Sequence, residues 1–473
     1  MTMRALSLAL VLATTTACSM TPKLTLPAAP VSPAYPLAPD LAPDGEAVPE
    51  WRAMFGDPRL QRLIALALDD NRDLRIAALN AETARAQIRV TRAQGLPEIN
   101  LEGTSIHQRQ PGSVAGAGVG LDNPSSAVTF GQFTAQAALT SFEIDLFGRL
   151  RAQNAAANER YLASREGQRA VRLTVIGAVA DAYLAERWAQ EQLGLTEATL
   201  ADWQTSRDIT RRLHGAGQAS GTELAQAEGQ VQQAQADLAQ GQRALMQATN
   251  ALVLAVGAPL PADLPAPIPL MQQPIRTALA AGLPSDLLLR RPDIAQAEHD
   301  LRAANADIGA ARAAFLPRLS LTGGFGFESL ALGALFNAGN RSWTYTPAIA
   351  APLFHGGALR GNLDLARLRT SIAVATYEKS IQGAFREVAD GLAARATFDR
   401  QVAAQQASAD QADRRVSLAG LSWKAGQTGR LELLDAQRSA YAARQALLTA
   451  RRDQLTSATA LYRALGGDPA ERP

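Results

Sequence analysis

Two kinds of apolar spacing follow one another in this chain of 473 residues. Between residues 291 and 315, apolar side chains recur three and four positions apart, which is the seam of a helix that packs along another helix. They are Ile294, Ala297, Leu301, Ala304, Ile308, Ala311 and Phe315. After Pro317 the period becomes two, the spacing of a strand with an apolar face and a polar or small-residue face. The pattern therefore predicts a helix that leads directly into a strand, with Pro317 at the joint.

The same junction occurs twice. An earlier segment aligns without gaps at an offset of 220 residues, which places Pro97 on Pro317. Further along the chain the offset becomes 209 residues, and Gly217 falls on Gly426. The chain is therefore a tandem repeat, and Pro97 and Pro317 are predicted to be equivalent helix-to-strand joints.

Each copy continues with a β-hairpin and a pair of long helices. The hairpins are predicted at about residues 97–142 and 317–353. Because Pro347 has no N–H to donate, we expect a bulge or an interrupted edge at that position. Residues 148–214 are nearly free of proline and glycine, so a helix of about 65 residues is expected, on the order of 100 Å long at about 1.5 Å per residue. A short turn then returns the chain as a second helix with an apolar heptad.

These elements divide the chain into six predicted segments. They are a signal peptide (1–17), a lipid-anchored extended segment (18–56), a first repeat (57–258), a linker (259–283), a second repeat (284–467) and a tail (468–473). Residues 22–49 contain eight prolines, a composition that favours an extended segment lying along a surface.

The N-terminus has the features of an export signal. Arg4 precedes a short apolar region, and Cys18 is the one cysteine of the chain, so no disulfide can form within it. The context of Cys18 resembles a bacterial lipobox, in which the cysteine is lipidated and becomes the mature N-terminus. Ser19 resembles the pattern that sorts lipoproteins to the outer membrane. The alternative is a plain signal peptide with an incidental cysteine.

The four predicted strands suit a membrane. About ten residues is the length that a tilted strand needs to cross a bilayer, and the alternation fits lipid on one face and water on the other. Four strands cannot close a barrel, and an open sheet edge in lipid would leave backbone groups unpaired. We therefore expect several copies of the chain to complete one barrel. The alternative is a soluble four-stranded sheet packed on the helices.

Composition and motifs give no indication of catalysis, metal binding or nucleic-acid binding. The net charge is +2, which gives no sign of nucleic-acid binding. The four histidines, His107, His214, His299 and His355, are isolated, so neither a metal site nor a cofactor is expected. Asp181 and Glu223 recur as Asp390 and Glu432 at equivalent helical positions, which indicates helix caps or interhelical partners. The sequence does not predict an enzyme.

Several segments together resemble the outer membrane factor family, the TolC-like channels, and within it the lipidated, OprM-like (NodT-type) branch. They are residues 56–75, 141–151, 287–323, 352–361 and 431–448. The resemblance runs from Cys18 to about Pro469. It implies a mostly α protein with a small membrane β-barrel. Four strands per chain would close a barrel of about 12 strands in a homotrimer, below which long antiparallel coiled coils form a periplasmic tunnel.

The resemblance also implies a function. It is the passive exit duct of a tripartite efflux system in the bacterial outer membrane, lipid-anchored, with a large periplasmic portion. An inner-membrane pump of the RND type and a periplasmic membrane-fusion adaptor would deliver small molecules or drugs. Two alternatives remain: the outer membrane component of a type I protein secretion system, and a periplasmic coiled-coil scaffold lipoprotein without a pore.

In the family, the helical tips form a constricted periplasmic entrance that is often lined by acids. The matching tips here are residues 213–223 and 423–432. The candidate gate residues are Gly217, Gln218, Glu223, Gly426, Gln427, Thr428, Arg430 and Glu432. The second tip is expected to present Gln427, Thr428 and Arg430, with no acid before Glu432. The resemblance therefore gives a location for the gate but no acidic ring.

Overall fold

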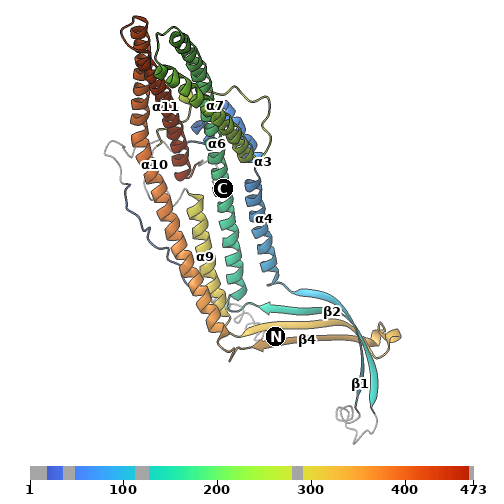
Figure 1. Cartoon of the computed structure of the whole chain (residues 1–473). Helices are drawn as coiled ribbons and strands as arrows, with labels where there is room; N and C mark the ends of the chain where they lie inside the picture. Colours follow the sequence, from blue (N-terminus) through green and yellow to red (C-terminus); the bar gives the residue numbers. More distant parts are fainter. Residues whose placement is uncertain (1–18, 36–47, 112–126, 280–290, 468–473) are drawn as a thin grey trace. The chain divides into compact units, whose positions relative to one another are not determined.

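The computed structural model describes residues 19–35, 48–111, 127–279 and 291–467. The predicted signal peptide, the lipidation site at Cys18 and the tail lie outside these residues. Within them, the helix, hairpin and helix-pair order predicted from the repeat is present twice (Figure 1). None of the described helices is both long enough and apolar enough to cross a membrane.

The first repeat begins with short helices and continues into the first hairpin and helix pair. Its elements are α2 (Trp51–Met54), α3 (Pro58–Asp70), α4 (Arg72–Ala93), β1 (Glu98–Gln110), β2 (Val128–Ile144), α6 (Arg149–Gly215) and α7 (Gly221–Val256). A single turn, η1 (Leu270–Gln272), lies in the linker.

The second repeat has the same order. Its elements are α9 (Pro292–Ala313), β3 (Arg318–Ser329), η2 (Leu332–Ala334), η3 (Ala338–Asn340), β4 (Arg341–Ala350), α10 (Ala358–Lys424) and α11 (Arg430–Ala464). The helices α6 and α10 have 67 residues each, as the scarcity of proline and glycine predicts.

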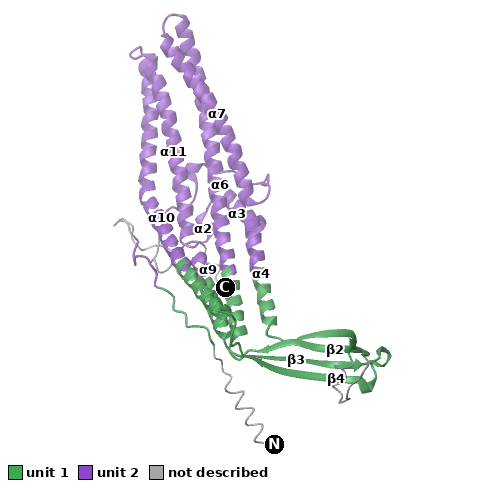
Figure 2. Cartoon of the chain, turned by 60° about the horizontal axis from the view of Figure 1, so that its bottom comes forward, with its two compact units in different colours: residues 1–27, 82–163, 298–375 green, residues 28–81, 164–297, 376–473 purple. Residues whose placement is uncertain are grey.

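Two compact units divide the chain, and they do not follow the repeats (Figure 2). Unit 1 consists of Met1–Pro27, Glu82–Ala163 and Glu298–Ala375. Unit 2 consists of Ala28–Ala81, Ser164–Ala297 and Thr376–Pro473. Each unit contains segments of both repeats, because the long helices α6 and α10 each contribute to both.

Unit 1 holds one antiparallel sheet in the order β1-β2-β3-β4. Residues directly opposite one another on neighbouring strands share a face. One such row is Leu101, Ala137, Phe325 and Trp343, and the next row, on the other face, is Glu102, Gln136, Gly326 and Ser342. The prediction of a sheet with one apolar and one polar face is confirmed.

The bulge expected at Pro347 is not present. Pro347 lies opposite Leu321 in a register that runs without a shift from Arg318 to Phe327. Within the chain, β4 is an edge strand, so every second N–H faces away from β3 and a proline is tolerated. The sheet has its irregularities elsewhere, between Leu139 and Phe142 and next to Glu98.

The extended segment after the predicted lipidation site lies on α9 in unit 1. Asn305 donates from Nδ2 to the carbonyl of Pro22 at 2.9 Å. One turn further on, Gly309 touches Thr21, and a Cβ there would lie 2.1 Å from the Thr21 Oγ1 and 2.8 Å from its Cα. Thr21 and Pro22 therefore pack on α9, and Gly309 is required for this close approach.

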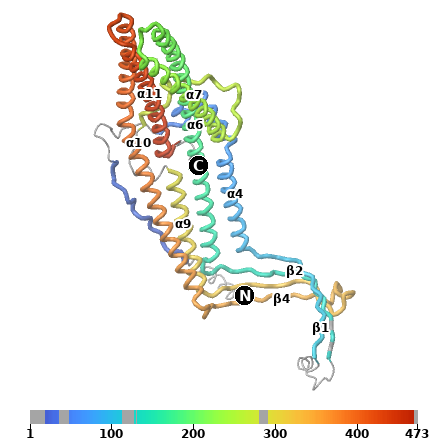
Figure 3. The backbone as a smooth tube through the Cα atoms, viewed as in Figure 1, coloured from blue at the N-terminus to red at the C-terminus, as the bar shows by residue number. Residues whose placement is uncertain are grey.

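Unit 2 contains the returning helices and their core. The chain reverses at two tips, so that α7 returns beside α6 and α11 returns beside α10 (Figure 3). The heptad residues Val231 and Ala234 of α7 are buried against Trp203 and Tyr441. Alanines at these positions let helices approach closely, which fits the leucine and alanine pattern of the sequence.

A buried carboxylate joins three parts of unit 2. Asp57 is fully buried and caps α3 by accepting from the Arg59 amide at 2.8 Å. Its other oxygen accepts from the Tyr183 hydroxyl at 2.6 Å and from the Gln273 Nε2 at 3.0 Å. This arrangement fixes the linker residue Gln273 against α6 and α3.

Candidate gate at the tips of the helical hairpins

The two tips begin with the same backbone turn. Gly217 and Gly426 have φ angles of +72° and +73°, a conformation that residues with a Cβ rarely adopt. The amide of the glutamine after each glycine donates to the carbonyl five residues earlier, at 2.8 Å in the first tip and 3.0 Å in the second. This Schellman closure explains why the two glycines recur at the same place in both repeats.

The returning helices begin differently. Ser220 caps α7 by accepting from the Glu223 amide at 3.2 Å, and the Glu223 carboxylate accepts from the Ser220 amide at 2.7 Å. Glu223 is thus a helix cap, as its position predicts. In the second tip the N-cap of α11 is Gly429, and Glu432 is exposed. The capping box is therefore a feature of the first tip.

Arg430 is not presented to solvent at the second tip, which corrects the expectation from the sequence. Its exposed fraction is 4%, and Nε donates to the Thr210 Oγ1 at 2.6 Å. Nη2 donates to the carbonyl and the hydroxyl of Ser206 at 2.9 Å and 2.8 Å. The guanidinium also lies 4.4 Å from the centre of the Trp423 ring. Arg430 thereby fastens the start of α11 to α6 of the other hairpin.

Burial lowers the pKa of Arg430, and the nearby Glu223 carboxylate opposes this shift. A guanidinium remains charged throughout the physiological range, so the cation is held by hydrogen bonds and by the aromatic ring. One guanidinium nitrogen, Nη1, is buried without a hydrogen-bond partner among the described residues. Burying a charged guanidinium costs free energy unless it is hydrogen-bonded, and the oxygens of Ser206 and Thr210 provide these bonds.

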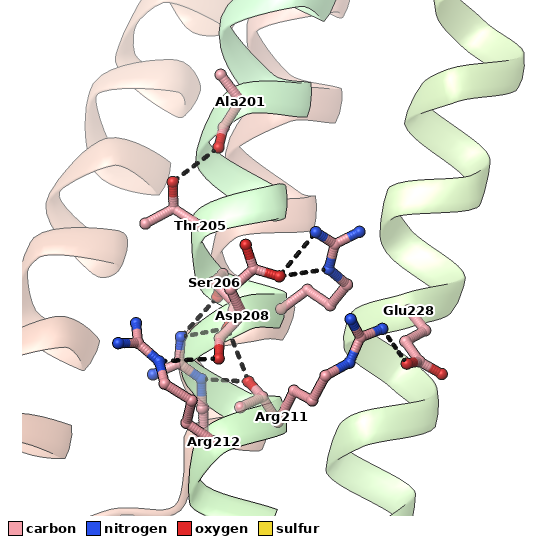
Figure 4. A network of polar contacts seen from close by, with 10 residues as sticks. Ala201, Thr205, Ser206, Asp208, Arg211, Arg212 and Glu228 are labelled. Atoms are coloured by element: carbon pink, nitrogen blue, oxygen red, sulfur yellow. Dashed lines mark hydrogen bonds and ion pairs between the residues drawn. The ribbon is translucent and has the colours of Figure 1, made fainter.

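Several exposed charges near the tips form ion pairs within a hairpin. On the first hairpin, Arg211 of α6 donates to the Glu228 carboxylate of α7 at 2.8 Å (Figure 4). On the second hairpin, Asp435 of α11 accepts from Arg438 at 2.8 Å and from Arg415 of α10 at 3.2 Å. Arg438 and Arg415 both lower the pKa of Asp435. At the two turns, the side chains of Gln218 and Gln427 are exposed, and Lys424 and Glu432 are exposed beside the second turn.

The partners of Arg430 were not found from the sequence. Ser206 and Thr210 are buried on α6, four residues apart and therefore on one face of the helix. Their hydroxyl character and spacing are visible in the sequence. Their alignment with Arg430 depends on how one hairpin packs against the other, which no repeat pattern encodes. Trp423 falls within the predicted second tip, but its contact with Arg430 was not predicted.

The remaining candidate residues are placed as follows. Pro97 and Pro317 each stand immediately before a strand, one residue ahead of β1 and β3. Asp181 is half-buried, whereas its repeat counterpart Asp390 has a side chain that is 74% exposed. His299 pairs with Glu159 at 2.7 Å, and the described residues contain no group of acidic, histidine or cysteine side chains suited to a metal.

Comparisons with known proteins agree with this geometry. The chain matches the outer membrane efflux protein family over residues 63–258 and 283–467. The solvent efflux pump outer membrane protein SrpC of Pseudomonas putida is 43% identical over 456 residues, covering 95% of each chain. The outer membrane protein OprJ of Pseudomonas aeruginosa is 41% identical over 453 residues, covering 95% of this chain and 93% of its own.

Solved structures give the same result. The open state of the MtrE outer membrane channel of Neisseria gonorrhoeae superimposes with a TM-score of 0.85 at 37% identity, covering 95% of this chain and 98% of that one. The CmeC outer membrane channel of Campylobacter jejuni gives a TM-score of 0.86 at 25% identity, covering 95% of each. This chain belongs to the outer membrane efflux protein family.

Proposed function

We propose that this chain is the outer membrane channel of a tripartite efflux system. It would work as a homotrimer and conduct small molecules out of the cell without chemistry of its own. An inner-membrane pump of the RND type and a periplasmic adaptor would deliver the substrates. The names of the relatives refer to efflux pumps, which favours efflux over protein secretion and over a scaffold without a pore.

The observation that carries this proposal is the open, two-faced sheet of unit 1. Among the described strands of one chain, β1 pairs with β2 alone and β4 with β3 alone, so both outer edges lack a partner strand there. The apolar face is exposed, at 89% for Leu101, 70% for Trp343 and 75% for Ile349. In lipid such a face is stable, but the edges are not. If the β1 edge of one copy paired with the β4 edge of the next, the backbone N–H and C=O groups of both edges would form hydrogen bonds and the barrel would close.

Helices of unit 1 support the same assembly. On α10, Leu365 and Leu368 are 44% and 62% exposed, three residues apart and therefore on one face. On α4, the side chain of Val90 is 56% exposed. These helices flank the sheet edges in sequence, since α4 precedes β1 and α10 follows β4. A neighbouring copy that closes the barrel would cover these apolar side chains too.

Further features support the proposed adaptor, lipid anchor and gate. Leu418, Leu421 and Leu431 are 57%, 64% and 45% exposed on the second hairpin, an apolar surface that fits the adaptor. Lipidation of Cys18 would tether the chain, and the contacts of Thr21 and Pro22 on α9 would hold the acylated end beside unit 1. The gate is proposed at the two tips, with Arg430 holding them together.

The test is conductance. The full chain is purified from membranes in detergent, its mass is measured by light scattering, and it is inserted into a planar bilayer. A trimer with discrete conductance steps is expected. A monomer that needs no detergent and conducts nothing would overturn the proposal.

Two variants on β4 serve as a matched pair for insertion. Tyr345 lies on the apolar face and Thr344 on the polar face. Tyr345→Lys should destabilise the inserted state, by about 0–1 kcal/mol at the membrane interface and by about 2–4 kcal/mol at the middle of the bilayer. Thr344→Lys should insert normally, because its side chain would face water. Equal insertion of both variants would argue against the assignment of the faces.

A further inference from the structure

The loop between β3 and β4 is unusually apolar for a segment at the end of a sheet. Residues 329–340 (SLALGALFNAGN) contain no charged side chain. Leu330, Leu332 and Phe336 are 73%, 63% and 72% exposed. A loop bathed in water rarely presents three large apolar side chains within seven residues, and such a patch marks a surface that meets something apolar.

The loop has a definite shape. It contains the single turns η2 and η3, and the Asn340 Nδ2 donates to the Ala334 carbonyl at 2.6 Å. The Asn337 amide donates to the same carbonyl at 3.0 Å. Leu335, in the middle of the loop, is buried. The exposure of the other apolar side chains is thus a property of an ordered loop.

The direction in which the loop bends identifies what it meets. The rings of Phe336 and Phe327 pack edge to face, with centroids 5.6 Å apart. Phe327 lies two residues after Phe325 and therefore on the same face of the strand. Phe325 pairs with Trp343, so this is the apolar face of the sheet. The loop therefore bends over the apolar face and not over the polar face that would line a channel.

The charges at this end of the sheet separate in the same way. Arg341 lies opposite Phe327 and therefore on the apolar face. Glu328, which follows Phe327 in β3, lies on the polar face and accepts a hydrogen bond from Gln132. An arginine at the end of an apolar face suits the phosphates of a lipid head group, with its stem along the acyl chains. The aromatic rings of Trp343 and Tyr345 stack nearby, a composition typical of the membrane interface.

We propose that the β3–β4 loop is a lipid-binding collar. Leu330, Leu332 and Phe336 enter the acyl region of the outer leaflet beside the sheet, and Arg341 meets the head-group phosphates. The inference rests on the proposed channel function, because it requires the sheet to be in the membrane. It adds that this loop holds the barrel at its outer rim and leaves the channel mouth uncovered.

The experiment places a fluorescent label at three positions of the full chain. Phe336→Cys reports on the collar, Ile349→Cys on the apolar face of the sheet and Ser342→Cys on its polar face. Each protein is labelled with an environment-sensitive thiol dye and reconstituted in phosphatidylcholine–phosphatidylglycerol vesicles. The unsubstituted chain, taken through the same labelling, corrects for any reaction at Cys18. Quenching is measured with nitroxide lipid and, separately, with aqueous iodide.

The proposal predicts that the label at residue 336 is quenched several-fold more by nitroxide lipid than the label at residue 342, with the reverse order for iodide. If residue 349 is quenched by lipid but residue 336 only by iodide, the collar is wrong and the inserted sheet stands. If residue 349 is not quenched by lipid either, the membrane insertion itself is wrong.

Conductance gives a second, independent reading. Replacing residues 330–336 by a glycine–serine segment of equal length should leave the single-channel conductance unchanged. A rise in conductance would show that the loop covers the mouth and would overturn the collar.

Discussion

The Arg430 Nε and the Thr210 Oγ1 are 2.6 Å apart, although the two residues belong to different repeats and to different helical hairpins. With its bonds to Ser206, Arg430 fixes the first residue of α11 against the side of α6. A channel that opens at its tips by moving one hairpin away from the other must break these bonds. Opening of that kind would therefore remove the hydrogen bonds of this side chain, together with other contacts between the hairpins.

Arg430→Ala should favour the open state. Hydrogen bonds to a charged group contribute about 1.5–3 kcal/mol each, and each 1.4 kcal/mol corresponds to about a tenfold change in an equilibrium. We expect larger or longer-lived conductance steps in a planar bilayer. Arg438→Ala is the matched control, since Arg438 also lies on α11 but is 67% exposed in a surface pair. Intact trimers with unchanged conductance for both variants would place the gate elsewhere.

Gly309→Ala should release the N-terminal segment from α9. The new Cβ would meet the Thr21 backbone at 2.8 Å and 2.9 Å, so the segment must move. Hydrogen exchange of residues 19–27 is expected to accelerate. Gly194→Ala is the control, because nothing lies within 4 Å of its Cβ position and the substitution should stabilise α6 by about 0.5–1 kcal/mol. Unchanged exchange in Gly309→Ala would mean that the contact does not hold the segment.

Asp181→Asn should change the dependence of stability on pH. Burial raises the pKa of Asp181 from 3.8 to about 6, and Arg463 opposes the shift. The folded chain thus binds this proton more tightly than the unfolded chain. The free energy of unfolding is therefore expected to fall as the pH rises from about 4 to about 6. The asparagine variant should lose that slope and gain at most about 3 kcal/mol at neutral pH.

Denaturation in detergent at several pH values measures the effect of this substitution. Asp390→Asn is the control, because Asp390 occupies the equivalent place in the second repeat but has a 74% exposed side chain. Parallel pH profiles for the unsubstituted chain and Asp181→Asn would show that Asp181 does not carry the dependence.

Tyr183→Phe should destabilise unit 2. The hydroxyl of Tyr183 is buried and donates to Asp57, which would keep Gln273 and the Arg59 amide as its donors. Leaving a buried carboxylate short of one donor costs about 1–3 kcal/mol. The midpoint of chemical denaturation should fall accordingly. Tyr161→Phe, on the same helix, should have little effect, and an equal loss for both would argue against a special role for the buried pair.

The repeat, the element order and the two-faced strands were predictable because they depend on local spacing. Periods of 3.6 and 2 are properties of single helices and strands, and Pro97 and Pro317 act on their own backbone. Gly217 and Gly426 belong to the same class, since a helix end that needs a positive φ selects glycine wherever it occurs. The capping role of Glu223 follows from its distance of three residues from Ser220.

Features that join distant segments were not predictable in this way. Of the bulge or interrupted edge expected at Pro347, the bulge is absent. Whether a strand residue needs its N–H depends on its place in the sheet, and within the chain β4 lies at the edge. The burial of Arg430 depends on the register between two hairpins. That register arises from side-chain packing along α7 and α11, where buried residues of both helices meet.

The sequence by itself determined that the chain is a duplicated unit of long helices and two-faced strands, because each of these traits is encoded within a few turns or residues. Only the tertiary structure decided that Arg430 faces inward, that Gly309 supports the N-terminal segment and that the β3–β4 loop bends over the apolar face. The first two depend on contacts between residues far apart in the chain, and the third on how a loop folds back on its own hairpin. The energies of all three are set by burial and geometry, which a local sequence pattern does not contain.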